Sequence, residues 1–224
     1  MGASNLAVRR GAKANRRKAI VAMKRKAQAA EATPAAQAVR AAALPVRYCV
    51  INRNVFETGM GSLILARGGS VGPVVVGGFL LDTFCRGVKD VTFQTIEAEQ
   101  LEAYLDVVND ATPLVPVDPS FAPKLVGDLV RWAGSFGFHP PRTFAALERL
   151  FGDADPRACD SEFEFGQDGK PFYMSGLNES PKVGRTHVKQ LLDQLGPDGF
   201  DFLIDDDDDD DSEPPPGIDY SEVD

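Results

Sequence analysis

The chain contains few of the residues on which metal-binding, disulfide-linked and membrane proteins depend. Its 224 residues include three cysteines and two histidines. Cys49, Cys85 and Cys159 lie far apart, form no CxxC pair and are odd in number, which argues against a disulfide framework and indicates a reducing compartment. With His139 and His187 they show none of the spacings typical of a zinc site. Apolar runs also stay well short of the ~20 residues that cross a bilayer, so we expect no membrane association.

The start of the chain lacks the features of a secretion signal. Arg9-Arg10 is not followed by an apolar segment, as general and twin-arginine secretion signals require. The alanine and arginine content is similar to that of a mitochondrial transit peptide, but serine is scarce and an apolar helix face of large residues is missing. We therefore expect a cytoplasmic, bacterial protein.

Each end of the chain is nearly devoid of one sign of charge. The first 40 residues contain ten Lys and Arg but a single acid, Glu31. Residues 198–224 contain thirteen Asp and Glu, including the unbroken run Asp205–Asp211, and no base. Such asymmetry indicates either electrostatic partners or tails that screen each other.

These shifts in composition predict three parts. Residues 1–44 form a basic, alanine-rich arm that is disordered or helical. Residues 45–204 contain almost all of the large apolar side chains and form a single α+β domain. Residues 205–224 form an acidic, disordered tail.

Three β-rich runs open the predicted domain. Residues 46–51, 62–67 and 74–84 are joined by short connections, which predicts an antiparallel three-stranded meander. The third run is the most apolar, as in a central strand covered on both faces. Gly77 and Gly78 within it predict a bulge or a close backbone approach.

Helical spacing of apolar residues follows the meander. We predict helices that begin near Thr95, Ser120 and Thr143, each of which can cap a helix N-terminus. The helix after Ser120 has the widest apolar stripe, from Leu125 to Phe136.

The last part of the domain combines a turn signal with a helix signal. Asp168-Gly169 lies between the alternating runs 162–165 and 170–174, which predicts a β-hairpin. Ser180-Pro181 predicts the start of a C-terminal helix, and residues 200–204 a final edge strand.

Three stretches resemble signatures of a known family. FLLDTFCRGVKD (79–90) resembles FLVDxYCLGVKD, and FEFGQDGKPFYMSG (163–176) resembles FxFGxDGKPFYxSGP. WAGSFGFHP (132–140) is similar to YAxxLGFxPH. Together they resemble a family of uncharacterised bacterial proteins, which implies no activity, substrate or catalytic residue. The chain departs from the pattern at Arg86, where the family has Leu.

The end of the third predicted strand holds the best candidates for chemistry. Asp82 and Asp90, with Glu97 or Glu99 from the next predicted helix, could bind Mg²⁺ through carboxylate oxygens and support phosphoester hydrolysis. Carboxylates are the ligands that this hard cation prefers. The hypothesis places a metal at the strand end, where ligands of α/β sheets bind.

Cys85 beside Lys89 offers a second chemistry at the same place. A neighbouring ammonium lowers the pKa of a thiol and makes it nucleophilic. In the competing interpretation Cys85 is a small core residue, while Asp82, Lys89 and Asp90 stabilise a turn.

A row of bases lies on the predicted C-terminal helix. Lys182, Arg185 and Lys189 follow at i, i+3 and i+7, with His187 between them. This spacing places the three bases on one helix face, which could contact phosphates. A solvated helix surface is the alternative.

The basic arm is the main candidate for nucleic-acid binding. Its contacts with phosphates would release counterions and weaken steeply with salt. The acidic tail could compete with nucleic acid for the arm, which is an autoinhibitory arrangement; a solubilising role for both tails is the alternative. The candidate residues are Arg9, Arg10, Lys13, Arg16, Arg17, Lys18, Lys24, Arg25 and Lys26.

The sequence therefore supports three hypotheses. The first is a non-enzymatic intracellular module that binds RNA, DNA or a ribonucleoprotein through its arm and requires no cofactor. The second is a Mg²⁺-dependent phosphoester hydrolase centred on Asp82 and Asp90. The third is a protein-interaction scaffold with solubilising tails.

Overall fold

The computed structural model describes residues 33–176 and 179–204. Its centre is a five-stranded antiparallel sheet with the strand order β4-β3-β2-β1-β5. The strands are β1 (Val46–Asn52), β2 (Met60–Gly68), β3 (Pro73–Asp82), β4 (Gly87–Glu97) and β5 (Leu114–Pro116). The predicted α+β class and the antiparallel meander are confirmed, and the meander continues into β4 as a fourth strand.

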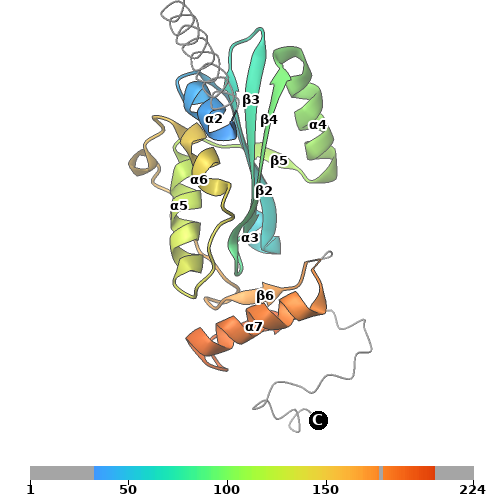
Figure 1. Cartoon of the computed structure of the whole chain (residues 1–224), viewed down its shortest axis with the longest axis vertical. Helices are drawn as coiled ribbons and strands as arrows, with labels where there is room; N and C mark the ends of the chain where they lie inside the picture. Colours follow the sequence, from blue (N-terminus) through green and yellow to red (C-terminus); the bar gives the residue numbers. More distant parts are fainter. Residues whose placement is uncertain (1–32, 177–178, 205–224) are drawn as a thin grey trace, which may run out of the picture.

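Helices cover both faces of this sheet (Figure 1). The helices are α2 (Pro34–Ala42), α3 (Val55–Thr58), α4 (Leu101–Ala111), α5 (Phe121–Gly134) and α6 (Phe144–Leu147). Short 3₁₀ turns are η1 (Ala98–Gln100), η2 (Glu148–Phe151) and η3 (Pro156–Ala158). Helices α2, α5 and α6 lie on one face, and α4 lies on the other.

The alternation of side chains along β2 explains this layering. Leu63 and Leu65 pack in the core beneath α5 and α6, whereas Ile64 and Ala66 pack in a second core beneath α4. Successive side chains of a strand point to opposite faces, so a strand with a core on both sides must be apolar throughout. This accounts for the continuous apolar runs of β2 and β3.

A smaller unit lies beyond the end of the sheet (Figure 1). It consists of β6 (Phe172–Met174), α7 (Pro181–Leu195) and β7 (Asp201–Leu203). Tyr173, Val188 and Leu191 are buried there together with Cys85 from the β3–β4 turn and with Phe136, which lies two residues after the end of α5. The third core therefore attaches α7 to the turn of the central hairpin, which strands β3 and β4 form.

The predicted hairpin around Asp168-Gly169 is wrong beyond its turn. The turn itself forms, with positive φ at Asp168 (51°) and Gly169 (79°) and a single bridge between Gln167 and Lys170. The flanking segments instead bond to the β3–β4 turn, and β6 pairs in parallel with β7. Non-local backbone hydrogen bonds have replaced the local ladder.

Two further boundaries differ from the predictions. The helix expected at Thr95 starts later, because Thr95 belongs to β4 and η1 begins at Ala98. Helix α2 lies within the segment assigned to the arm, is capped by Thr33, and buries Ala38 and Ala41 in the main core. Among the residues that the structure describes, none of the helices has the length and apolar character to cross a bilayer.

Candidate functional site

Glu179 is the centre of a polar cluster that joins three separate segments. Arg86, in the β3–β4 turn, donates from Nη1 to Glu179 Oε1 (2.9 Å) and Oε2 (3.1 Å). His187 Nδ1, on α7, lies 2.9 Å from Oε1, and the Gly176 N–H donates to Oε2 at 3.1 Å. One carboxylate thus connects the central hairpin with the start and the second turn of α7.

The charges in this cluster are set by burial and by the ion pair. Burial opposes ionisation of Glu179, but the Gly176 N–H, Arg86 and His187 outweigh it and hold the carboxyl pKa below its usual range. Burial, followed by repulsion from Arg86, lowers the pKa of His187. At neutral pH a neutral imidazole therefore donates its Nδ1–H to an ionised Glu179, and the Tyr173 hydroxyl lies 3.4 Å from the same nitrogen.

A carboxylate–imidazole pair of this kind can orient a general base, but a nucleophile must lie within its reach. Cys85 is the thiol in the same core and is fully buried. Burial, with the charge of Asp82, raises its pKa rather than lowering it. Burial therefore opposes the lowered pKa that an activated Cys85 beside Lys89 would require, and it favours the interpretation of this thiol as a core residue.

Asp82 stabilises the turn after β3. Its Oδ1 accepts the N–H groups of Phe84 (3.2 Å) and Cys85 (2.8 Å), and only 3% of the residue is exposed. Burial raises the pKa of Asp82, which also disfavours the charge that a metal ligand requires. This arrangement agrees with the structural interpretation of the motif.

The proposed Mg²⁺ ligands do not converge as a group of three in the part of the chain that the structure describes. Asp90 is exposed and accepts the N–H of Val91 at 2.8 Å, whereas Asp82 is buried at the hairpin end. Glu97 pairs with Pro73 at the opposite end of β4, roughly 23 Å along the strand from Asp90 at ~3.3 Å per residue. Nowhere in residues 33–176 and 179–204 do three or more His, Cys, Asp or Glu converge as a metal site would require.

The basic row predicted on α7 lies on an exposed surface. Lys182, Arg185 and Lys189 are all exposed, while Gly184 and Val188 are buried against the small unit. The first turn of the helix contains no acid. At ~1.5 Å per residue the row extends over about 10 Å.

Two further cations lie at the base of α7. Arg86 and Lys89 are half-buried, and the Lys89 Nζ lies 3.7 Å from the position that a Cβ on Gly176 would occupy. Lys89, a candidate catalytic residue, thus lies beside the segment that leads into α7. The charge of Glu179 compensates for part of this positive charge.

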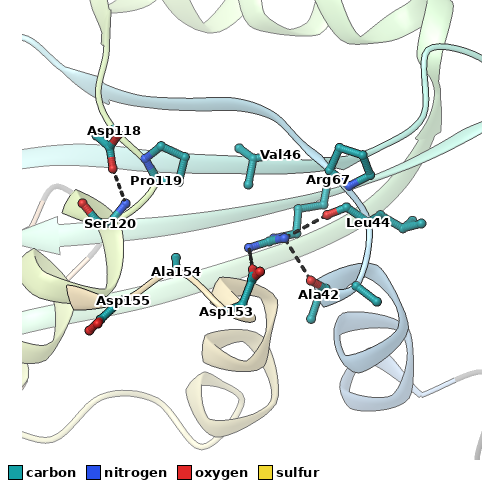
Figure 2. A pocket seen from close by; sticks show the side chains of 12 residues that line it. Ala42, Leu44, Val46, Arg67, Asp118, Pro119, Ser120, Asp153, Ala154 and Asp155 are labelled. Carbon is teal, nitrogen blue, oxygen red and sulfur yellow. Dashed lines mark hydrogen bonds and ion pairs between the residues drawn. The ribbon is translucent and has the colours of Figure 1, made fainter. Parts of the chain in front are cut away.

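A separate cavity of about 730 Å³ lies between α2 and the start of α5 (Figure 2). The buried Arg67 lines it and donates from Nη1 to the carbonyls of Ala42 (2.9 Å) and Leu44 (2.8 Å). Nη2 donates to the Phe151 carbonyl at 2.6 Å and lies 3.5 Å from Asp153. Arg67 therefore satisfies carbonyls at the ends of α2 and η2, and we assign it a structural role.

The carboxylates at the edge of this cavity are also engaged locally. Asp118 accepts from the Ser120 N–H, which with the Ser120 hydroxyl lowers its pKa. Asp155 pairs with Arg157, which lowers its pKa in the same way. These groups stabilise the ends of neighbouring segments and do not converge on a common point.

The candidate residues of the arm, from Arg9 to Lys26, lie outside the described residues, as does the acidic run from Asp205. Sequence reasoning missed Glu179 and the role of Arg86, because the pair is separated by 93 positions. His187 could have been found, since it lies three residues after the inward-facing Gly184, at a helical spacing.

Comparison with protein-family models, with curated proteins and with solved structures yields no match. The resemblance of three short stretches to a bacterial family therefore does not assign the chain to a family, and its function has to be argued from the geometry.

Proposed function

We propose that this protein is a non-enzymatic module that binds the phosphate backbone of nucleic acid through the basic face of α7, defined as Lys182, Arg185 and Lys189, together with the basic arm. The observation that supports this most directly is the exposure of all three bases on one face of a helix whose first turn has no acid. Bases and a helix N-terminus are both favourable to phosphate.

The dimensions of the face fit a nucleic-acid strand. Its length of about 10 Å corresponds to roughly three phosphates at 3.4 Å of axis per nucleotide. Three neutralised phosphates predict a slope of log K against log salt of about −2.7 for duplex DNA and about −2 for a single strand. The contribution of the arm adds to this slope.

The attachment of α7 suits a binding surface. The Arg86–Glu179 ion pair (2.9 Å) and the His187–Glu179 contact (2.9 Å) fasten the helix to the central hairpin. A base on a fixed helix loses less conformational freedom on binding than one on a mobile segment. The cluster thus supports binding in a structural way, without taking part in chemistry.

The test compares two triple variants of the full chain. K182Q/R185Q/K189Q neutralises the face of α7, whereas R53Q/R142Q/R149Q removes three exposed arginines from other elements. Binding to a single-stranded RNA and a duplex DNA is measured by fluorescence anisotropy at 50 mM salt with Mg²⁺.

We expect a loss of affinity for duplex DNA of at least about 40-fold for the α7 variant, as a slope difference of about 2.7 over a fourfold range of salt implies, and less than a twofold loss for the control. Equal losses in both variants would show that only net charge matters and would contradict the proposal. Absence of binding by the unmodified chain would also contradict it and would direct attention to protein partners.

A further inference from the structure

We infer that the basic face of α7 is also a docking surface for the acidic run Asp205–Asp211 of the same chain. The inference rests on the proposed function of this face, for which the run and nucleic acid compete. The sequence alone predicted that the acidic tail competes with nucleic acid for the basic arm. We place this competition at the face of α7 instead.

The point at which the described chain ends supports this assignment. Strand β7 ends at Leu203, and Ile204 packs against the core of the small unit. Two carbons of the Ile204 side chain lie 3.8 Å from where a Cβ on Gly184 would be. Gly184 is flanked along α7 by Lys182 and Arg185. The first aspartate therefore follows a residue that is already in contact with the helix that bears the basic face.

The run is long enough to reach all three bases. Seven extended residues cover roughly 24 Å, whereas the basic face is about 10 Å long and a helix is about 10–12 Å across. The run can pass around the helix and still lie along the row. It adds seven negative charges beside three positive ones.

The basic arm is attached farther away. Helix α2, which follows the candidate bases of the arm in the sequence, lies at the opposite end of the molecule from α7 (Figure 1). A segment tethered next to its site has an effective concentration on the order of millimolar, which falls as the distance to be crossed grows. The face of α7 is therefore favoured over the arm as the first surface that the run meets.

The docking is tested without nucleic acid, by lysine acylation of the full chain followed by mass spectrometry. Two variants replace Asp205–Asp211 by seven Asn, which removes the charge, or by seven Glu, which keeps it. Lys182 and Lys189 report on the face, and Lys170, exposed in the turn before β6, is the reference.

We expect Lys182 and Lys189 to react about three- to tenfold faster in the Asn variant, with the Glu variant unchanged and Lys170 constant. In 0.5 M salt the difference should disappear, since exposed charges are then screened within a few ångströms. Equal reactivity in all three proteins would overturn the inference. An increase confined to the lysines of the arm would overturn it too and would place the tail there.

A binding measurement separates this inference from the proposed function. The Asn variant should bind RNA about three- to tenfold more tightly, and this gain should vanish when K182Q/R185Q/K189Q is added. A change in lysine reactivity without any nucleic-acid binding would contradict the proposed function alone. Nucleic-acid binding through α7 without a change in reactivity would contradict the docking alone.

Discussion

Arg86 and Glu179 lie 93 positions apart and form an ion pair in which Nη1 is 2.9 Å from Oε1, between the turn of the central hairpin and the start of α7. The Arg86 side chain is 23% exposed and that of Glu179 10%, so water screens the pair only in part. This pair is one of the polar attachments of the small unit to the sheet, together with the bond from the Phe172 N–H to the Phe84 carbonyl.

Replacing Arg86 by Leu, which removes the guanidinium and keeps an apolar side chain, tests this attachment. We expect R86L to lose about 1–3 kcal/mol of unfolding free energy in urea, because Glu179 keeps its charge in a largely buried position. The control is R131Q, which breaks the exposed pair with Asp128 and should change stability by less than about 0.5 kcal/mol. Equal stability of R86L and the unmodified chain would show that the pair contributes nothing.

The lowered pKa of His187 predicts a pH dependence of stability. Below its ordinary value of 6.5 the unfolded chain binds a proton before the folded chain does, so the unfolding free energy falls as pH decreases through this window. Glu179, whose pKa is lowered from 4.5, adds a second loss at more acidic pH.

Urea titrations between pH 7.5 and pH 5 would detect the first loss. H187Q should abolish it, whereas H139Q, which changes an exposed histidine, should retain it. Stability that stays constant over this range in the unmodified chain would contradict the assignment of charge in the cluster.

The three thiols should differ sharply in reactivity. Burial raises the pKa of Cys85, and it raises that of Cys49 to about 12, whereas Cys159 is only half-buried. Alkylation of the native protein with iodoacetamide at pH 8 should add a single label, at Cys159, with the other two labelled only in denaturant. Native labelling of Cys85 at the rate of Cys159 would revive the nucleophile hypothesis.

Gly77 is predicted to tolerate no side chain. A Cβ there would lie 2.7 Å from Leu150 Cδ2 and 3.0 Å from Leu147 Cδ1, beneath α6 and η2. We expect G77A to lose about 1–3 kcal/mol of unfolding free energy. G127A, where a Cβ meets nothing within 4 Å, should instead gain up to about 1 kcal/mol. Similar effects of the two substitutions would contradict the packing described for the main core.

Local signals predicted much of this fold. The apolar runs of β1, β2 and β3 and the start of α7 after Ser180-Pro181 depend on short-range preferences, and the structure confirms them. The glycine pair at 77 and 78 instead makes room for the side chains of Leu147, Leu150 and Thr92. Strand β4 was missed because its polar residues alternate with apolar ones at an edge of the sheet, where Thr95 and Glu97 resemble a helix start. The residues from Thr95 onward fit the alternation of an edge strand as well as the start of a helix.

Features that depend on distant partners could not be predicted. The Phe172 N–H bonds to the Phe84 carbonyl (2.9 Å), and Gly166 bonds to Thr83 (2.9 Å), so the strands expected beside Asp168-Gly169 pair elsewhere. In the candidate site the basic row was visible from its helical spacing alone. Its attachment through Glu179 was not, because an ion pair across 93 positions leaves no local pattern.

The central claim is that the face of α7 contacts phosphates, and the slope of log K against log salt tests it most directly. The slope for duplex DNA is measured from 50 to 200 mM salt for the full chain, for K182Q/R185Q/K189Q and for R53Q/R142Q/R149Q. If each base of the face neutralises one phosphate, the slope of the first variant should be less negative by about 2.7 than that of the full chain. The slope of the control should be unchanged. An identical slope for all three proteins would contradict the account.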